Sequence, residues 1–103
     1  MAGSVLIIDD SLTLLQRMKQ HLEAEHYEVH VATTYPDARP HLGHADLVII
    51  DFHMPGQDGA SMLQSLRSGA RGLPNPPLMY LHTTDTEKAA TYKDLGFDGV
   101  VGM

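Results

Sequence analysis

The chain has 103 residues, of which 43% are hydrophobic and 19% are charged, so its composition is that of an ordinary globular protein with room for one domain. The formal net charge of −6 and the lack of any basic run argue against a nucleic-acid or membrane surface, because such surfaces need clustered Lys and Arg. The lack of cysteine excludes disulfides and thiolate metal sites, and the apolar runs are too short for a membrane span. We therefore expect a soluble protein of a reducing compartment such as the cytoplasm.

Five short segments have the pattern of β-strands. Four of them are continuously apolar, which is typical of strands covered on both faces of a parallel sheet; they span residues 5–8, 47–50, 78–81 and 100–101. The fifth, residues 28–32, alternates between polar and apolar side chains. We interpret it as an edge strand with one wetter face.

Four segments between these strands have helical patterns. Residues 12–25 carry an apolar stripe at Leu15, Met18 and Leu22, with Asp10 or Ser11 as the cap. The others span residues 35–42, where Pro40 should shorten or kink the helix, residues 60–68, and residues 86–95, with Thr84 or Asp85 as the cap and Gly96 as the stop. Alternating strands and helices predict a doubly wound α/β fold with a parallel five-stranded sheet.

The last predicted strand is followed by only two residues, Gly102 and Met103. In a doubly wound fold this strand needs a covering helix. We therefore expect a single domain over residues 1–103 that is truncated at its C-terminus, or a homodimer in which a second copy covers the exposed face.

Three carboxylates follow two of the predicted strands. Asp9 and Asp10 end the first strand and Asp51 ends the third. In open parallel sheets, ligands bind beyond the carboxyl ends of the strands, and carboxylates that converge there repel each other unless a cation or a proton intervenes. Mg²⁺ is the favoured ion because it prefers oxygen ligands, and a carboxylate beside it is a competent phosphoryl acceptor. If His53 and His82 join the aspartates, a transition metal is favoured instead.

These residues carry a resemblance to a known family. The segments VLIIDDS at residues 5–11 and LVIIDFHMPGQDG at residues 47–59 resemble the two signature segments of response-regulator receiver domains. The similarity extends over the whole chain and includes GFDG at residues 96–99. It implies the flavodoxin-like strand order 2-1-3-4-5, a phosphoacceptor at Asp51, and Mg²⁺ held by Asp9, Asp10, Asp51 and the backbone carbonyl of His53. It also implies that Gly59 starts the following helix.

The second half of the chain departs from the family pattern. The hydroxyl residue that contacts the phosphoryl group in receivers falls on His82 when counted from Pro77, or on Thr83 if the loop has slipped by one residue. The aromatic switch position aligns with Val100, and the lysine that pairs with the phosphoryl group aligns with Met103. Losing that lysine removes a charge-assisted partner worth about 1.5–3 kcal/mol. We expect an atypical receiver in which phosphorylation is weakly coupled to the distal face.

Three functions are consistent with these residues. The first is a phosphorelay module, not an enzyme beyond slow self-dephosphorylation, which receives a phosphoryl group from a histidine kinase or a phosphotransfer protein. The second is a pseudo-receiver that binds partners independently of phosphorylation. The third is a phosphatase of the haloacid-dehalogenase type, which is disfavoured because it needs an aspartate where the chain has His53.

Overall fold

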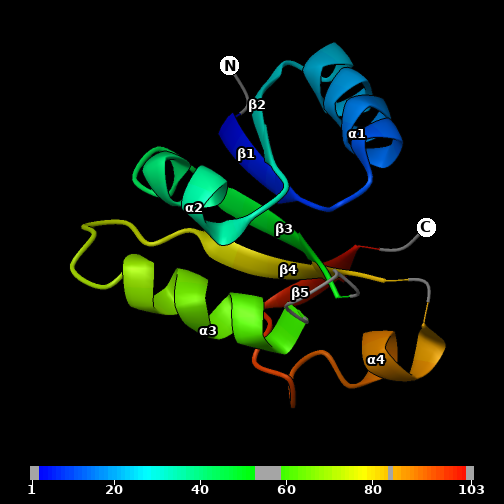
Figure 1. Cartoon of the computed structure of the whole chain (residues 1–103), viewed down its shortest axis with the longest axis vertical. Helices are drawn as coiled ribbons and strands as arrows, with labels where there is room; N and C mark the ends of the chain where they lie inside the picture. Colours follow the sequence, from blue (N-terminus) through cyan, green and yellow to red (C-terminus); the bar gives the residue numbers. More distant parts are fainter. Residues whose placement is uncertain (1–2, 53–58, 84, 102–103) are drawn as a thin grey trace.

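A five-stranded parallel sheet in the order β2-β1-β3-β4-β5 forms the centre of the molecule (Figure 1). The computed structural model describes residues 3–52, 59–83 and 85–101. The strands are β1 (Gly3–Ile8), β2 (Tyr27–Ala32), β3 (Leu47–Asp51), β4 (Leu78–His82) and β5 (Gly99–Val101). The helices are α1 (Leu12–Ala24), α2 (Tyr35–Ala38), the 3-10 helix η1 (Arg39–His41), α3 (Gly59–Gly69) and α4 (Thr86–Ala90). The predicted fold class and strand order are confirmed, with 28–32 inside the edge strand β2.

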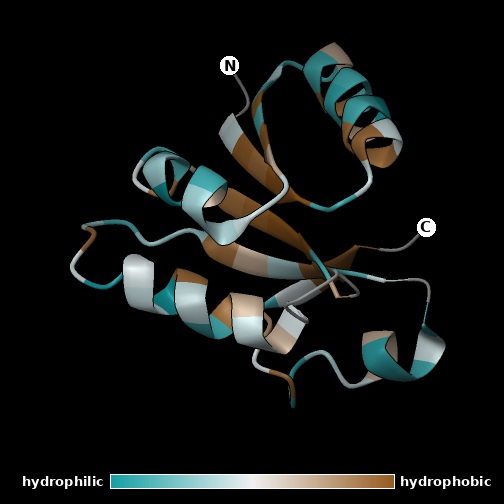
Figure 2. Cartoon of the chain, viewed as in Figure 1, coloured by the Kyte–Doolittle hydropathy of each residue, from teal (hydrophilic) through white to brown (hydrophobic). Residues whose placement is uncertain are grey.

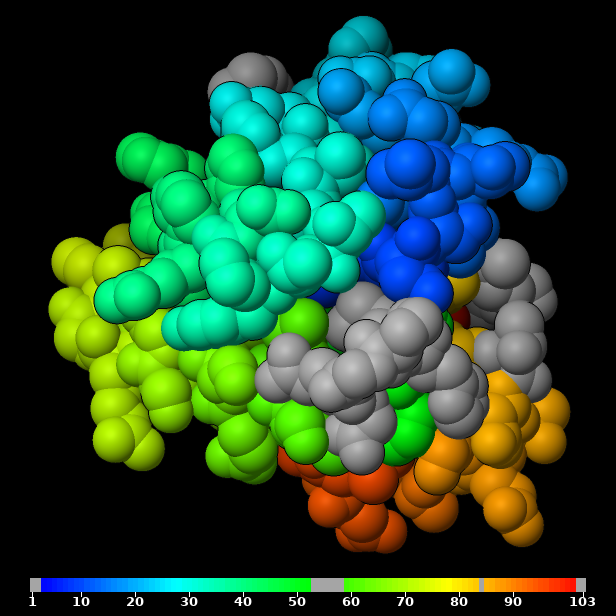
Figure 3. Space-filling model, in the orientation of Figure 1, coloured from blue at the N-terminus to red at the C-terminus, as the bar shows by residue number. Residues whose placement is uncertain are grey.

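Much of β1 and β3 is brown in Figure 2 and therefore apolar, and each face of the sheet packs against different helices. On one face, Leu6, Ile50 and Leu81 pack with residues of α3 and with Phe97. On the other face, Ile7 and Ile49 pack with Leu15 of α1. Figure 1 shows this division, with α1 on one side of the sheet and α2 and α3 on the other, and Figure 3 shows the surface that α2 (cyan-green) and α3 (green to yellow-green) form together.

Local sequence signals determine where the first two helices begin and end. Ser11 is the N-cap of α1, and its hydroxyl accepts from the Leu14 amide at 3.3 Å. Thr34 caps α2 in the same manner through the Asp37 amide. The helical segment that begins at Tyr35 changes to 3-10 geometry at Arg39, one residue before Pro40. Because proline lacks an amide hydrogen and clashes with the preceding turn, the prediction that Pro40 shortens this helix is confirmed.

The last helix is shorter than predicted. The expected range 86–95 is wrong: α4 ends at Ala90, and turns continue to Gly96. The Thr91 hydroxyl donates to the Glu87 carbonyl at 2.9 Å and the Thr91 amide also donates to the same carbonyl, and such back-bonding by threonine competes with regular helix. Gly96 has a φ of +98°, so the predicted stop signal is present, although it ends a run of turns.

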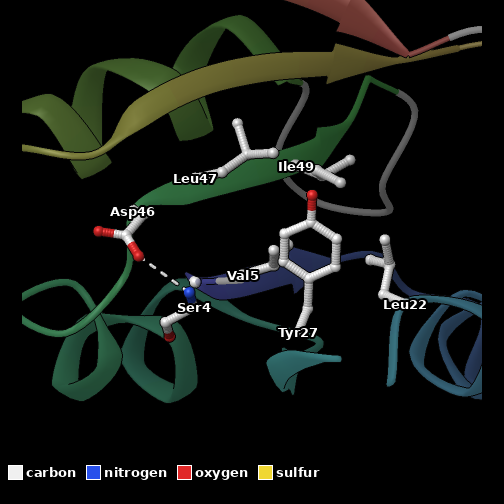
Figure 4. A pocket seen from close by; sticks show the side chains of 8 residues that line it. Ser4, Val5, Leu22, Tyr27, Asp46, Leu47 and Ile49 are labelled. Atoms are coloured by element: carbon white, nitrogen blue, oxygen red, sulfur yellow. Dashed lines mark hydrogen bonds between the residues drawn. The ribbon is translucent and has the colours of Figure 1, made fainter. Parts of the chain in front are cut away.

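Two carboxylates secure the strands at the amino edge of the sheet, opposite the predicted site. Asp46 Oδ2 accepts from the Ser4 amide at 2.9 Å, as the dashed line in Figure 4 shows. Asp98 Oδ2 accepts from the Met79 amide at 2.9 Å, and Arg67 donates to the Gly96 carbonyl at 2.6 Å beside it. The Asp46–Ser4 and Asp98–Met79 bonds connect residues that are 42 and 19 positions apart in the sequence, so they fix the strand ends relative to each other.

Candidate metal and phosphoacceptor site

The strand register brings the predicted site residues to one edge of the sheet. Ile8 lies opposite Ile50 in the β1–β3 pair, so Asp9 and Asp51 follow at the carboxyl ends of neighbouring strands. Asp51 lies opposite His82 in the β3–β4 pair. The Phe52 amide donates to the His82 carbonyl at 3.2 Å, so the backbone immediately after Asp51 stays attached to the end of β4.

Asp9 is a buried carboxylate with one unsatisfied oxygen. The residue is only 2% exposed. Oδ1 accepts from the Ser11 amide at 2.9 Å, whereas Oδ2 has no hydrogen-bond partner among the residues that the structure describes. Burial raises the pKa of Asp9 to about 6, the Ser11 amide opposes this rise, and the negative charges of Asp51 and Asp10 reinforce it. An ionised Asp9 therefore needs a positive partner that these residues do not supply.

His82 is the second buried polar residue at this edge. It is 4% exposed, and its Nε2 has no hydrogen-bond partner within the described part of the chain. Burial lowers the pKa of His82 below its ordinary value, and the nearby Asp9 carboxylate partly opposes this effect. Neutral imidazole, with a free nitrogen lone pair, is the form in which histidine binds metals.

Asp9, Asp51 and His82 together have the composition and spacing of a divalent-ion site. One ligand atom from each residue lies within 4.8 Å of the other two. First-row divalent ions bind oxygen and nitrogen at about 2.0–2.2 Å, so small side-chain rotations would close this set around an ion. The unsatisfied Asp9 oxygen and the unsatisfied His82 nitrogen give such an ion two buried ligands.

The other predicted site residues have different surroundings. Asp10 is exposed and lies outside this three-residue group, so its contact with an ion stays a prediction. Thr83 is buried, and its hydroxyl accepts from the Asp85 amide at 3.1 Å. Asp85, in turn, is the N-cap of α4. Val100 is half-buried in β5 and packs against the core on the α3 side. His53, Thr84 and Met103 lie outside the described residues.

Two further residues near Asp51 were not identified from the sequence. Gly59 begins α3, as predicted, but its proximity to the backbone of the acceptor strand was not foreseen: a Cβ at Gly59 would lie 2.7 Å from Phe52 Cα, and the Gly59 amide donates to the Phe52 carbonyl at 2.7 Å. Lys88 of α4 places its ammonium 4.5 Å from the centre of the Phe52 ring. Neither a single glycine nor a single lysine has a local sequence signal for such a contact.

Comparison with known proteins identifies the family. The model of the response regulator receiver domain family matches residues 5–102. The chain belongs to this family. It is therefore a receiver domain, a module of two-component signalling, and the resemblance noted in the sequence is confirmed.

Individual receivers are similar to the chain in sequence and in fold. The aerobic respiration control protein ArcA of Escherichia coli K12 is 35% identical over 85 residues, which cover 81% of this chain and 34% of ArcA. The chain thus spans about a third of the length of this curated relative. The signal receiver domain of a histidine kinase from Syntrophus aciditrophicus is 28% identical, with a TM-score of 0.75 and coverage of 98% of this chain and 78% of that one. Response regulator TrrA of Thermotoga maritima has the same fold, with 24% identity, a TM-score of 0.78 and coverage of 98% and 86%.

The register of the structure bears on the predicted phosphate-contact residues His82 and Thr83. Counting from Pro77 placed the family's hydroxyl residue at His82, and a slipped loop placed it at Thr83. The structure pairs His82 with Asp51 across the strands, while the Thr83 hydroxyl is engaged by the Asp85 amide. His82, and not Thr83, is therefore the residue level with Asp51, and its place in the family pattern stays a prediction. Across the described residues, no helix is both long and apolar enough to span a membrane.

Proposed function

We propose that this receiver domain accepts a phosphoryl group on Asp51. The observation that supports the proposal is the meeting of Asp51 with the buried, incompletely satisfied Asp9 at the carboxyl edge of a receiver sheet. An accepting carboxylate needs an in-line approach and neutralisation of charge more than it needs covalent assistance. Asp51 is half-buried at the end of β3, so its oxygens are near the surface while the strand fixes their direction.

The donor set fits Mg²⁺ as the neutralising ion. Asp9 Oδ2 is a buried oxygen without a partner among the described residues, and Asp51 offers a second carboxylate within 4.8 Å. We assign both residues as ligands, with Asp10 as a further ligand or as a partner of the ion's water shell. The bound ion would offset the charge that these carboxylates and an incoming phosphoryl group share.

The residues of this chain then have simple roles in the transfer. Asp51 supplies the oxygen that forms the new O–P bond as the P–N bond to the donor's histidine breaks and the leaving imidazole takes a proton. Gly59 and the Phe52 backbone hold the strand end, and Lys88 places a cation against the Phe52 ring. We infer a histidine kinase or phosphotransfer protein as the donor, a cytoplasmic location where such a donor acts, and no enzymatic activity beyond slow self-dephosphorylation.

The test is binding of the phosphate mimic beryllofluoride in the presence of Mg²⁺, followed by fluorine NMR. We expect a saturable bound signal with the wild type, and its loss in Asp51→Asn. The matched control is Asp94→Asn, because Asp94 is an exposed aspartate in the turns after α4. Absence of a bound signal in the wild type, or its persistence in Asp51→Asn, would contradict the proposal.

A pseudo-receiver that works without phosphorylation is the second candidate. Its support is the imidazole of His82 level with Asp51, at the position where the resemblance places the hydroxyl residue of receivers. This candidate predicts that Asp51→Asn leaves the binding of a partner unchanged, whereas the phosphoacceptor proposal predicts a change when the donor is present. Pull-down of the partner with and without a phosphodonor separates the two.

A further inference from the structure

We propose that His82 is a direct metal ligand, so that this receiver site binds imidazole-accepting transition ions such as Co²⁺ and Zn²⁺ through Asp9, Asp51 and His82. The inference rests on the proposed function insofar as both use the same carboxylates. It adds a nitrogen ligand and a metal selectivity that the carboxylates alone would not produce.

The first observation is the environment of the His82 ring. Only 4% of the His82 surface is exposed, and its Nε2 has no hydrogen-bond partner among the described residues. A buried histidine nitrogen without a partner costs free energy, and most buried polar groups avoid that cost by pairing. One ring nitrogen of His82 lies within 4.8 Å of a carboxylate oxygen of Asp9 and a carboxylate oxygen of Asp51.

The second observation is the arrangement of the three strands that position these residues. Asp51 and His82 end β3 and β4, and Asp9 directly follows β1, so the three residues lie at one edge of three neighbouring strands. The Phe52-to-His82 backbone bond and the Asp9-to-Ala32 backbone bond, at 3.2 and 3.1 Å, fix the strand ends. Two of the three residues therefore lie within strands, and the third is attached to the end of β2 by its backbone amide, which is an arrangement that holds a metal site in shape.

The third consideration is the preference of each metal ion for carboxylate oxygen or imidazole nitrogen. Mg²⁺ demands hard oxygen ligands and keeps much of its water, so it gains little from an imidazole. Borderline ions such as Co²⁺, Ni²⁺ and Zn²⁺ bind imidazole well, and their affinity for a given site generally exceeds that of Mn²⁺. A site of two carboxylates and one imidazole thus accepts Mg²⁺ through its oxygens and transition ions through all three residues.

The selectivity test compares His82→Thr with the wild type by calorimetric titration of Mg²⁺ and Zn²⁺ separately. Thr restores the hydroxyl that the family pattern has here, and His82→Gln is the second variant if the smaller side chain prevents folding. We expect Zn²⁺ affinity to fall at least about tenfold in either variant, because a ligand is lost, whereas Mg²⁺ affinity changes less than about threefold. Transition ions bind most protein sites more tightly than Mg²⁺ does. The informative quantity is therefore the loss of Zn²⁺ affinity in the variant compared with the loss of Mg²⁺ affinity in the same variant.

The matched control is His44→Thr, which removes an exposed histidine from the loop before β3. His41→Thr is a second control, because the rings of His30 and His41 stack with centroids 4.5 Å apart and offer a competing surface site. Both controls should leave the stronger Zn²⁺ site intact. A direct readout is NMR of isotope-labelled histidine side chains, in which Zn²⁺ should shift the ring nitrogens of His82.

The outcomes separate the inference from the proposed function. Unchanged Zn²⁺ affinity in His82→Thr, or equal losses for Mg²⁺ and Zn²⁺, would overturn the role of His82 while the beryllofluoride test of Asp51 still stands. Unshifted His82 resonances at Zn²⁺ saturation would overturn it as well. A wild type that binds neither ion would contradict both the inference and the metal part of the proposed function.

Discussion

At the scale of single residues, Asp9 is a side chain whose environment opposes its ionised form. It is almost fully buried, and its Oδ2 lacks a hydrogen bond among the described residues. The raised pKa of about 6 expresses this cost, because a tenfold change in a proton-binding equilibrium corresponds to about 1.4 kcal/mol. The fold therefore tolerates an unfavourable charge at the position where the proposed ion would compensate it.

The pH dependence of stability follows from this pKa. The folded pKa of about 6 exceeds the ordinary aspartate value of 3.8, so the contribution of Asp9 is most favourable below pH 4 and is lost as the pH rises through 6. In metal-free buffer at pH 7.5, we expect Asp9→Asn to be more stable than the wild type, by up to about 3 kcal/mol. This advantage should shrink toward pH 4. Urea unfolding at several pH values measures it.

The control for this measurement is Asp94→Asn, which removes one carboxylate from an exposed residue in the turns after α4. Burial lowers the pKa of His82, so its effect on stability has the opposite sign, and the residue is present in both proteins of the comparison. A wild type that is more stable than Asp9→Asn at pH 7.5 without metal would show that the Asp9 carboxylate has a stabilising partner.

The sequence predicted part of the site for a physical reason. Asp9 and Asp51 could be paired because the ends of parallel strands converge, whatever the details of the loops. The role of His82 could not be assigned from sequence, because a shift of one residue exchanges His82 with Thr83 and reverses which side chain faces the acceptor. Only the pairing of Asp51 with His82 resolves that register.

At the scale of elements, the start of α3 depends on a glycine for close packing. A Cβ at Gly59 would lie 2.7 Å from the backbone of Phe52, which cannot move aside as a flexible side chain would. We expect Gly59→Ala to destabilise the domain by about 1–3 kcal/mol, the range for overpacking, as measured by the denaturant midpoint.

The comparison variant for this prediction is Gly43→Ala. A Cβ there meets its nearest neighbour, Leu73, at 4.0 Å, so the change should stay within about 0.5 kcal/mol. Equal midpoints for Gly59→Ala and Gly43→Ala would mean that the backbone after β3 yields without cost.

The strands were easier to predict than the last helix because they bury more of their side chains. The apolar runs at 5–8 and 47–50 admit few alternatives because both faces of these strands are buried. Residues 86–95 have a helical pattern, but α4 buries none of its residues. Without packing to reinforce the pattern, the hydrogen bonds of Thr91 end the helix at Ala90.

At the scale of the whole molecule, the two faces of the sheet are unequally packed. The face that carries α3 buries Met62, Leu63 and Leu66 of that helix, whereas α1 buries only Leu15 among its described residues. On the α1 face, a groove of about 370 Å³ extends between α1 and the strands, with Met18, Ile49, His82 and Val101 among its lining.

This inequality predicts a difference in local stability. Because opening α1 exposes less apolar surface than opening α3, we expect α1 amides to exchange with a lower free energy of opening in native-state hydrogen exchange. The comparison is internal, since both helices are measured in the same sample. Equal free energies for the two helices would show that they open only with the whole domain.

The carboxylates of Asp46 and Asp98 at the amino edge have a consequence for engineering. They attach to strand amides at the edge of the sheet opposite to Asp9, Asp51 and His82, so the residues that fix the strand starts are separate from those of the proposed ion site. A combinatorial library that randomises positions 9, 51 and 82 while keeping both of these carboxylates would retain the attachments of the strand starts. Such a library could be screened for ion preference on one constant scaffold.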